Sequence, residues 1–385
     1  MPERRVIAGL DIGTSKVCAI IGETGCYGEL NIFGVGTSPS YGLKKGMVVN
    51  LDKTVQAIAA AVDAAERMAG IEVSSVCVGV AGGHITSFNS HGVVAVANSN
   101  EITEQDVHRV LEAAKVIALP SDRRIIHVLP REFIVDSCRG IKDPEGMAGK
   151  RLEVNVHIVT GAVTALQNII KCVERAGLEV EDLVLQPIAS SISVLTLDEQ
   201  DSGTVLIDIG GGTTDLAVFY EGSICHTGII PVGGNHFTQD LAFGLRIPFA
   251  EAERLKLQYS QEPFEEIVRP RSEELFILVK EELVKLQELN IVPVQCVLTG
   301  GSSQLHGLKE IAQTILDLPV RIGSPSEVEG LFDMINSPVY ATGIGLLLYS
   351  GKYCPPDVAE ASVDSLWLNL ADRIKQWFKD FIPLE

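Results

Sequence analysis

Two short glycine-containing turns in this sequence have the composition of phosphate-binding sites. The first reads Gly13-Thr14-Ser15-Lys16 and the second reads Gly210-Gly211-Gly212-Thr213. Glycine leaves backbone N–H groups unshielded, while the hydroxyls and the lysine add donors and a positive charge. Because a phosphate group needs several converging donors, we expect both turns to contact the phosphates of one ligand. Ordinary hairpin geometry is the alternative for either turn taken alone.

An aspartate stands two residues before each turn, at Asp11 and Asp208. Mg²⁺ on nucleotide phosphates keeps several waters and accepts one or two carboxylates. Two aspartates that face each other across a cleft therefore suit a magnesium site in which water links the carboxylates to the ion. The Walker pattern GxxxxGK[ST] is absent, which excludes a P-loop protein.

Two further glycine pairs stand where an apolar run gives way to a helical pattern, at Gly233-Gly234 and at Gly300-Gly301-Ser302. Backbone amides at a helix start lie at the positive end of the helix dipole. We expect both segments to form additional walls of the same cleft, and simple helix entry is the alternative.

The elements that must position these turns occur in the same order, βββαβ, in both halves of the chain. Asp11 and Asp208 are 197 residues apart, about half of the chain, which indicates a duplicated domain rather than a short repeat. Two similar lobes would enclose a cleft, where ligands commonly bind. The predicted elements are strands Val6–Leu10, Val17–Gly22 and Leu30–Gly36, helix Asp52–Ala69 and strand Ser75–Ala81, then strands Val205–Ile209, Asp215–Tyr220 and Ser223–Pro231, a helix from about Asn235 and strand Val294–Thr299.

Two segments interrupt the halves. The first has a helical pattern at Thr103–Leu119 and strand patterns at Ile125–Leu129, Phe133–Asp136 and Leu152–Val159, which predicts a small α+β domain. The second is charged and helical, with a helix start predicted at Ser272. The predicted division is 1–84 with 160–190 for the first core subdomain, 85–159 for its insert, 191–247 with 293–350 for the second core subdomain, 248–292 for the helical insert, 351–364 for a linker and 365–385 for a terminal helix.

The terminal segment is strongly amphipathic. Its apolar face is rich in tryptophan and phenylalanine, a composition that suits the headgroup boundary of a membrane. Packing against the core or against a partner helix is the alternative. The residues predicted to contact lipid are Leu366, Trp367, Leu370, Ile374, Trp377, Phe378 and Phe381.

Composition limits the remaining classes of function. The chain has 385 residues, of which 46% are hydrophobic, and its net charge of −19 argues against a nucleic-acid binder. Its eight cysteines form no CxxC pair, so we expect no zinc site and a reducing cytosol. No run of about 18 apolar residues is present, so we expect no membrane-spanning helix.

The order of these motifs resembles the actin-like ATPase superfamily and, within it, the FtsA family of bacterial cell-division proteins. The resemblance covers essentially residues 5–385. Four segments carry it: Gly9–Val17, Val156–Gly161, Asp208–Asp215 and Ser337–Gly343.

The resemblance implies a duplicated α/β fold of two βββαβα lobes around a nucleotide cleft, with a small inserted α+β subdomain and a C-terminal amphipathic helix. It implies ATP and Mg²⁺ as ligands, with Asp11 and Asp208 near the ion. The phosphates would contact Gly13, Thr14, Ser15, Lys16, Gly210, Gly211, Gly212, Thr213, Gly233 and Gly234, and the nucleoside would contact Glu253, Lys256, Gly300, Gly301 and Ser302. For Glu253 and Lys256, a surface ion pair is the alternative.

The resemblance also places Gln186 where relatives such as MreB carry a glutamate that orients the attacking water. A neutral amide can position water but accepts a proton poorly, so we expect a weak ATPase at most.

The family function would be self-assembly on the cytoplasmic face of the membrane at the division site. There the protein would anchor FtsZ filaments through the FtsZ C-terminal peptide and recruit later division proteins. In the family the helical insert receives this peptide, and Arg271 is a candidate contact, with a solvated charge as the alternative. Two rival readings are a small-molecule kinase of the same superfamily and an actin-like pilus-assembly adaptor.

Overall fold

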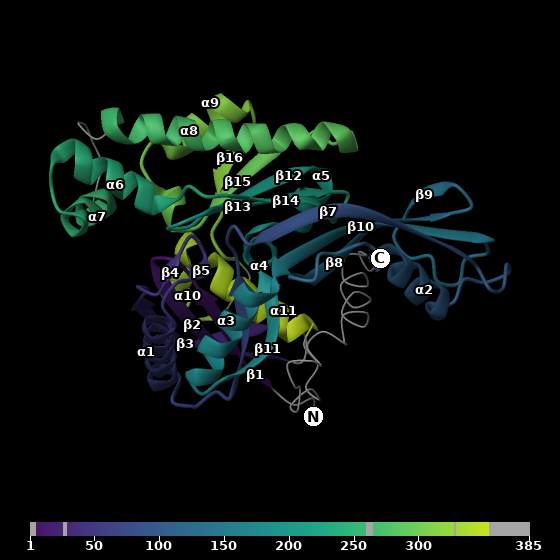
Figure 1. Ribbon diagram of the computed structural model, residues 1–385, viewed down its shortest axis with the longest axis horizontal. Helices are drawn as coiled ribbons and strands as arrows, with labels where there is room; N and C mark the ends of the chain where they lie inside the picture. Colours follow the sequence, from purple (N-terminus) through teal and green to yellow (C-terminus); the bar gives the residue numbers. More distant parts are fainter. Residues whose placement is uncertain (1–4, 26–28, 259–264, 327–328, 354–385) are drawn as a thin grey trace.

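The computed structural model describes residues 5–25, 29–258, 265–326 and 329–353. Figure 1 shows two lobes, one above the other, and a long arm that extends to one side. We call them the first lobe, the second lobe and the insert. The predicted terminal helix at 365–385 and its lipid-facing residues lie outside the described residues.

The first lobe is built on a six-stranded sheet in the order β11-β6-β1-β2-β3-β17. Strand β1 pairs antiparallel with β2 and parallel with β6. Helix α1 begins at the Asn50 cap, whose side chain accepts from the Lys53 amide, and ends at Gly70 in the left-handed conformation. The elements are β1 Arg5–Ile12, β2 Lys16–Thr24, β3 Leu30–Pro39, β4 Leu43–Lys44, β5 Met47–Val48, α1 Leu51–Ala69, β6 Ser75–Val80, α3 Val163–Arg175, β11 Glu179–Leu185 and β17 Glu329–Gly330.

The second lobe repeats this arrangement on a five-stranded sheet in the order β14-β13-β12-β15-β16. Strand β12 pairs antiparallel with β13 and parallel with β15, as β1 does with β2 and β6. The predicted duplication of the fold is therefore confirmed. The elements are β12 Thr204–Ile209, β13 Thr214–Tyr220, β14 Ser223–Ile230, α6 Gly234–Leu245, α7 Phe249–Gln258, α8 Glu265–Val284, η1 Lys285–Leu289, β15 Gln295–Thr299, η2 Gly301–Gln304, α9 Leu308–Leu316 and β16 Val320–Ile322.

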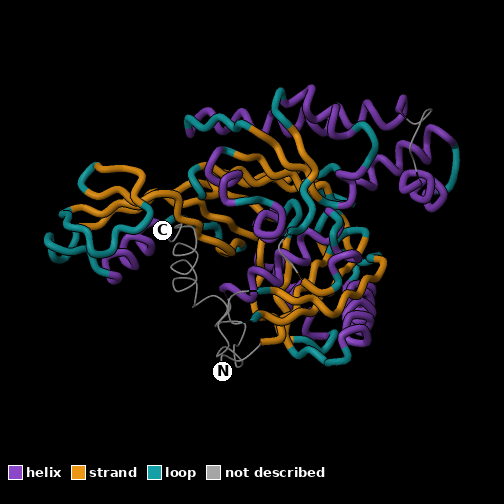
Figure 2. The backbone as a smooth tube through the Cα atoms, turned by 180° about the vertical axis from the view of Figure 1, so that it is seen from behind, coloured by secondary structure: helices purple, strands orange, loops and turns teal. Residues whose placement is uncertain are grey.

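The insert has its own four-stranded sheet, in the order β7-β10-β8-β9, with helix α2 packed on β7 and β10. Its core is separate from those of the lobes, and the arm is visible from both sides in Figures 1 and 2. The elements are β7 Ile85–Ala95, α2 Glu104–Lys115, β8 Arg123–Val135, β9 Cys138–Ile141 and β10 Arg151–Ala162.

Strand β8 joins what the sequence predicts as two strands. Pro130 would normally interrupt a strand because it lacks a donor. Here the pairing with β10 shifts between Val156↔Pro130 and Asn155↔Glu132, so that Arg131 forms a bulge. Strand β9 pairs only from Phe133 onward, so Pro130 has a partner strand on one side alone.

Helix α8 begins earlier than predicted. Ser272 was expected to cap its start, but the helix already runs from Glu265, and the Ser272 hydroxyl donates to the Val268 carbonyl at 3.0 Å. Arg269 and Arg271 therefore lie inside the helix, on either side of Pro270. Ser272 is a buried mid-helix residue that bonds back to its own helix.

The chain crosses between the lobes twice. Helices α4 (Gln186–Val194) and α5 (Leu197–Ser202) form the first crossing, and the segment from β16 to β17 returns. The following elements are α10 (Phe332–Ile335), η3 (Pro338–Tyr340) and α11 (Ala341–Tyr353).

This return corrects one predicted boundary. Residues 293–350 were assigned wholly to the second lobe, yet β17 pairs with β3 and α11 packs on β1, β2 and β6 of the first lobe. Helix α11 also includes Gly351–Tyr353, predicted as the start of a linker. Tyr353 is buried, and its ring lies beside that of Tyr349, with centroids 4.9 Å apart and the planes tilted by 48°.

Candidate functional site

A cleft of about 530 Å³ lies between the lobes. Its walls come from the two hairpin turns, from the start of α6, from α7 and from the β15–η2 junction. The predicted site residues that line it are Asp11, Gly13, Thr14, Ser15, Lys16, Gln186, Asp208, Gly210, Gly211, Gly212, Thr213, Gly234, Glu253, Lys256, Gly300, Gly301 and Ser302. Gly233 lies behind this surface, where an added Cβ would stand 2.7 Å from the Gly210 carbonyl oxygen.

The two turns close in the same way. The Gly13 amide donates to the Lys16 carbonyl at 2.9 Å, and the Gly210 amide donates to the Thr213 carbonyl at 3.0 Å. The duplication therefore extends to the backbone bonds of the site.

The two turns lie against each other, and both line the cleft. A Cβ added at Gly212 would stand 2.6 Å from Thr14 Oγ1, and one at Gly211 would overlap the Ser15 hydroxyl. Ser15 also donates to Asn235 Oδ1 at 3.1 Å. Since any side chain at these glycines would fill the space, the arrangement fits a phosphate held by backbone amides.

Asp11 lies near the end of β1, where the Gln186 amide donates to its Oδ1 at 2.8 Å. Burial raises the pKa of Asp11 to about 6, Lys16 opposes this rise and Asp208 adds to it. Lys16 Nζ donates to the Val339 carbonyl and lies 4.6 Å from the centre of the Tyr340 ring.

Asp208 holds the matching position in the second lobe. Its Oδ2 accepts from Ser190 Oγ at 2.5 Å and from Thr342 Oγ1 at 3.2 Å. Burial raises the pKa of Asp208, and these hydroxyls partly oppose the rise. A half-buried carboxylate and a buried one that repel each other are suited to a bound cation between them, so the donor set fits Mg²⁺.

Asp215 also lines the cleft, although no sequence motif assigns it a role. It pairs with Asp208 across the β12–β13 hairpin, and its Oδ1 is buried without a partner among the described residues. Burial, with Asp208 second, raises its pKa to about 8. The first lobe has Cys18 at the corresponding position, opposite Asp11. The sequence does contain one signal for Asp215: the segment Asp208–Asp215, which includes the second turn, has an aspartate at each end.

Glu253 and Lys256 form an ion pair that is anchored inside the protein. Lys256 is buried, and its Nζ donates to Glu253 Oε2 at 2.8 Å, to Thr238 Oγ1 at 2.8 Å and to the Gly234 carbonyl at 3.1 Å. These bonds fix α7 to the start of α6, at one end of the cleft. Further lining residues that the sequence analysis did not select are Asn235, Leu257, Gln304, Leu305, His306 and Thr342.

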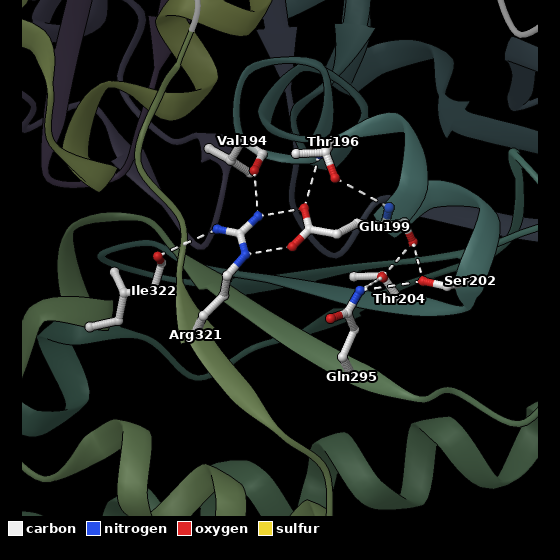
Figure 3. A network of polar contacts seen from close by, with 8 residues as sticks. All are labelled: Val194, Thr196, Glu199, Ser202, Thr204, Gln295, Arg321 and Ile322. Carbon is white, nitrogen blue, oxygen red and sulfur yellow. Dashed lines mark hydrogen bonds and ion pairs between the residues drawn. The ribbon is translucent and has the colours of Figure 1, made fainter. Parts of the chain in front are cut away.

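A bidentate ion pair joins the two crossings of the chain (Figure 3). Arg321 of β16 donates to both carboxylate oxygens of Glu199 in α5, at 2.6 Å each, and to the Val194 carbonyl at 2.7 Å. The pair therefore fixes the end of α4 to the edge of the second sheet.

Arg271 lies away from the cleft-lining residues. It donates to both carboxylate oxygens of Asp240 on α6, at 2.7 and 3.0 Å, and it pairs with Glu274. Its charge is thus partly neutralised by Asp240 of α6 and Glu274 of α8.

Two sequence families match the chain. The family described as "SHS2 domain inserted in FTSA" matches residues 82–160, and "Cell division protein FtsA" matches residues 205–345. Cell division protein FtsA of Pseudomonas aeruginosa is 44% identical over 406 residues, which cover 97% of this chain and 97% of the relative.

Two solved structures share the fold. A chain of the PilM–PilN type IV pilus biogenesis complex superposes with a TM-score of 0.70 and 20% identity, over 90% of this chain and 98% of that chain. MreB5 of Spiroplasma citri bound to ADP superposes with a TM-score of 0.50 and 17% identity, over 90% of this chain and 96% of that one. This chain thus has the actin-like duplicated fold, and it belongs to the FtsA family of cell-division proteins.

Proposed function

We propose that the cleft between the lobes binds ATP together with Mg²⁺. One observation carries this proposal: two equivalent turns, each preceded by an aspartate that lines the cleft, converge on one cavity. The turns would hold the phosphates, and Asp11 and Asp208 would hold the ion through water. Bound Mg²⁺ would neutralise phosphate charge. The end of the cleft at Lys256 would receive the nucleoside.

We further propose that ATP turnover is slow. Gln186 is the candidate for positioning the attacking water, and its side-chain amide donates to Asp11. A neutral amide is a weak proton acceptor. Turnover should therefore fall well below the 1–100 s⁻¹ typical of kinases. A phosphate-release assay on the purified protein checks this, and kinase-like turnover would contradict it.

The family assignment supports a role in anchoring FtsZ filaments at the cytoplasmic face of the inner membrane, with self-assembly on that surface and recruitment of later division proteins. The helical insert is the proposed site for the FtsZ C-terminal peptide. Phe249 on α7 of this insert is exposed, and Phe243 on the neighbouring helix α6 is 86% exposed, a type of surface that often contacts partners. Arg271 stands on the adjacent helix as a candidate for the acidic peptide.

Membrane attachment is proposed for residues 365–385. Vesicle co-sedimentation of the full chain, with and without ATP, tests it directly. Changing both Trp377 and Phe378 to Glu should abolish sedimentation. Changing Asn369 and Gln376 to Glu adds the same charge to the opposite face and serves as the control. Equal sedimentation of the full chain and of a chain ending at Asp364 would contradict the proposal.

The two rival functions predict different results. A small-molecule kinase would release ADP only in the presence of its substrate. A pilus-type adaptor that reaches the membrane through protein partners would not sediment with bare vesicles.

A further inference from the structure

We propose that Ser190 and Thr342 are positioning residues that hold the Asp208 carboxylate in the orientation needed for Mg²⁺-dependent nucleotide binding. The inference rests on the proposed ATP–Mg²⁺ function. It gives a role to Ser190, which no motif includes, and to Thr342, which lies in the segment Ser337–Gly343 but had no role assigned to it.

One carboxylate oxygen of Asp208, Oδ2, accepts hydrogen bonds from both hydroxyls. Ser190 Oγ lies 2.5 Å and Thr342 Oγ1 lies 3.2 Å from Oδ2, and the two hydroxyls are 3.0 Å apart. All three side chains are buried. The other oxygen, Oδ1, lies beside Gly300, where an added Cβ would overlap it. Because Gly300 lines the cleft, the hydroxyls turn Oδ1 toward the cleft wall.

Helix α4 fixes the positions of the side chains that contact the two aspartates. Ser190 stands one helical turn after Gln186, so both side chains lie on the same face of the helix. Gln186 donates to Asp11 of the first lobe, and Ser190 donates to Asp208 of the second. A single rigid helix therefore sets the carboxylates of both lobes relative to each other.

The close packing of α4 on α11 completes the arrangement. An added Cβ at Gly345 of α11 would overlap the Ala189 carbonyl of α4. This contact brings Thr342, in the first turn of α11, beside Ser190. The rotation of an aspartate about its terminal torsion is otherwise broad. Without the hydroxyls, the Asp208 carboxylate would also adopt orientations in which it cannot bind the hydrated Mg²⁺ ion.

The test is the Mg²⁺ dependence of nucleotide affinity in the full-length protein. A fluorescent ATP analogue is titrated in excess Mg²⁺ and again in EDTA, and thermal unfolding reports whether each variant folds. Hydrogen bonds to charged groups are worth enough to change a binding constant about tenfold. We therefore expect Ser190→Ala to lower the ratio of the two affinities about tenfold, with the affinity in EDTA nearly unchanged.

Ser191→Ala is the matched control. Ser191 is equally buried on the same helix, and its hydroxyl donates only to the Ile188 carbonyl of that helix, at 2.7 Å, among the described residues. It should keep the wild-type ratio. A second pair covers α11: Thr342→Val, which removes the hydroxyl, should lower the ratio, and Thr342→Ser, which keeps it, should restore the ratio.

Two results would overturn the inference. One is a wild-type ratio in both Ser190→Ala and Thr342→Val. The other is an equal fall in Ser191→Ala, which would indicate general loosening of α4. Failure of the proposed function is a different outcome, because wild-type protein would then bind no nucleotide in either buffer.

Discussion

At the scale of single residues, the cleft depends on positions where a side chain cannot be accommodated. Gly300 has a φ of +82° and lies against Asp208 and the Ile209 carbonyl. Left-handed backbone is costly for residues with a Cβ, and here the neighbours also leave no space.

We predict that Gly300→Ala greatly weakens nucleotide binding, by at least about tenfold, because the new methyl group displaces Asp208. Gly307→Ala is the control. Gly307 has a similar φ of +76°, but an added Cβ there meets nothing within 4 Å. It should lose only about 1–2 kcal/mol of stability from backbone strain. Equal nucleotide affinity in the two variants, measured by titration, would contradict the prediction.

The sequence identified the residues that carry recognisable turn chemistry and missed those that act from regular elements. Glycines and their flanking aspartates stand out because turns constrain residue type. Ser190 and Thr342 sit inside helices, where a hydroxyl carries no local signal of its role, although Thr342 falls in the recognised segment Ser337–Gly343. Asp215 ends the recognised segment Asp208–Asp215, but its burial opposite Asp208 follows only from the hairpin register.

At the scale of elements, the Arg321–Glu199 pair is one of the contacts that fix the two interlobe crossings to each other (Figure 3). Arg321 is partly exposed, so water screens the pair. Its bidentate geometry and the added bond to Val194 nevertheless favour a measurable contribution.

We predict that Arg321→Met lowers the free energy of unfolding by roughly 1–2 kcal/mol at neutral pH. The pKa of Glu199 is lowered in the folded protein; burial opposes this shift, and the Arg321 and Thr196 bonds outweigh it. The contribution is therefore present above the ordinary glutamate pKa and is lost as pH falls through the folded value.

Urea unfolding of wild type and variant across this acid range measures the effect, and the difference should shrink as pH falls. Arg175→Met removes a more exposed pair with Asp52 and should change stability by less than about 0.5 kcal/mol. A constant difference for Arg321→Met at all pH values would contradict the argument.

Element boundaries were predictable where propensity and packing agree. Helix α1 has a cap, an apolar face and a terminal glycine, and the sequence predicts it almost to the residue. Helix α8 and strand β8 each contain a proline, which normally marks an end. Helix α8 continues past its proline because Val268 and Ser272 are packed in the interior. Strand β8 continues past its proline because a bulge forms at Arg131.

At the scale of the whole molecule, the insert leaves the first lobe but bonds to the second. Ser87 donates to the Thr227 carbonyl at 2.9 Å, and Lys142 donates to Ser223 Oγ at 2.9 Å. We call this contact between the insert and β14 the seam. Buried His157 lies in it, with its ring nitrogens 2.9 Å from Asn89 Oδ1 and 3.0 Å from Thr227 Oγ1. The insert therefore bridges the lobes through β14.

Because His157 is buried in this seam, we predict that the stability of the protein falls in acid. Burial, followed by the nearby His226 and Arg131, lowers the pKa of His157 to about 3 from 6.5. Between these values the unfolded chain binds more protons than the folded one, so stability falls as pH decreases from about 6.5. The slope from this residue is at most about 1.4 kcal/mol per pH unit.

His157→Gln should flatten this acid decline, because glutamine keeps a polar side chain and does not titrate. His108→Gln changes an exposed histidine on α2 and should leave the slope as in wild type. Thermal unfolding between pH 7.5 and pH 5 is the measurement. An unchanged slope in His157→Gln would show that the seam is not the source.

The return of the chain to the first lobe is the largest feature that the sequence did not predict. Strand β17 has only two residues and carries no strand pattern, and α11 is apolar on all sides and so indicates burial without a location. The pairing of β17 with β3 and the packing of α11 on β1, β2 and β6 show that both belong to the first lobe.

The most direct test of the account is a crystal structure of the protein grown with Mg²⁺ and a non-hydrolysable ATP analogue. We predict triphosphate density between Gly13–Lys16 and Gly210–Thr213, with Mg²⁺ between Asp11 and Asp208 and the base toward Lys256. Nucleotide bound elsewhere, with the two turns still in direct contact, would contradict it.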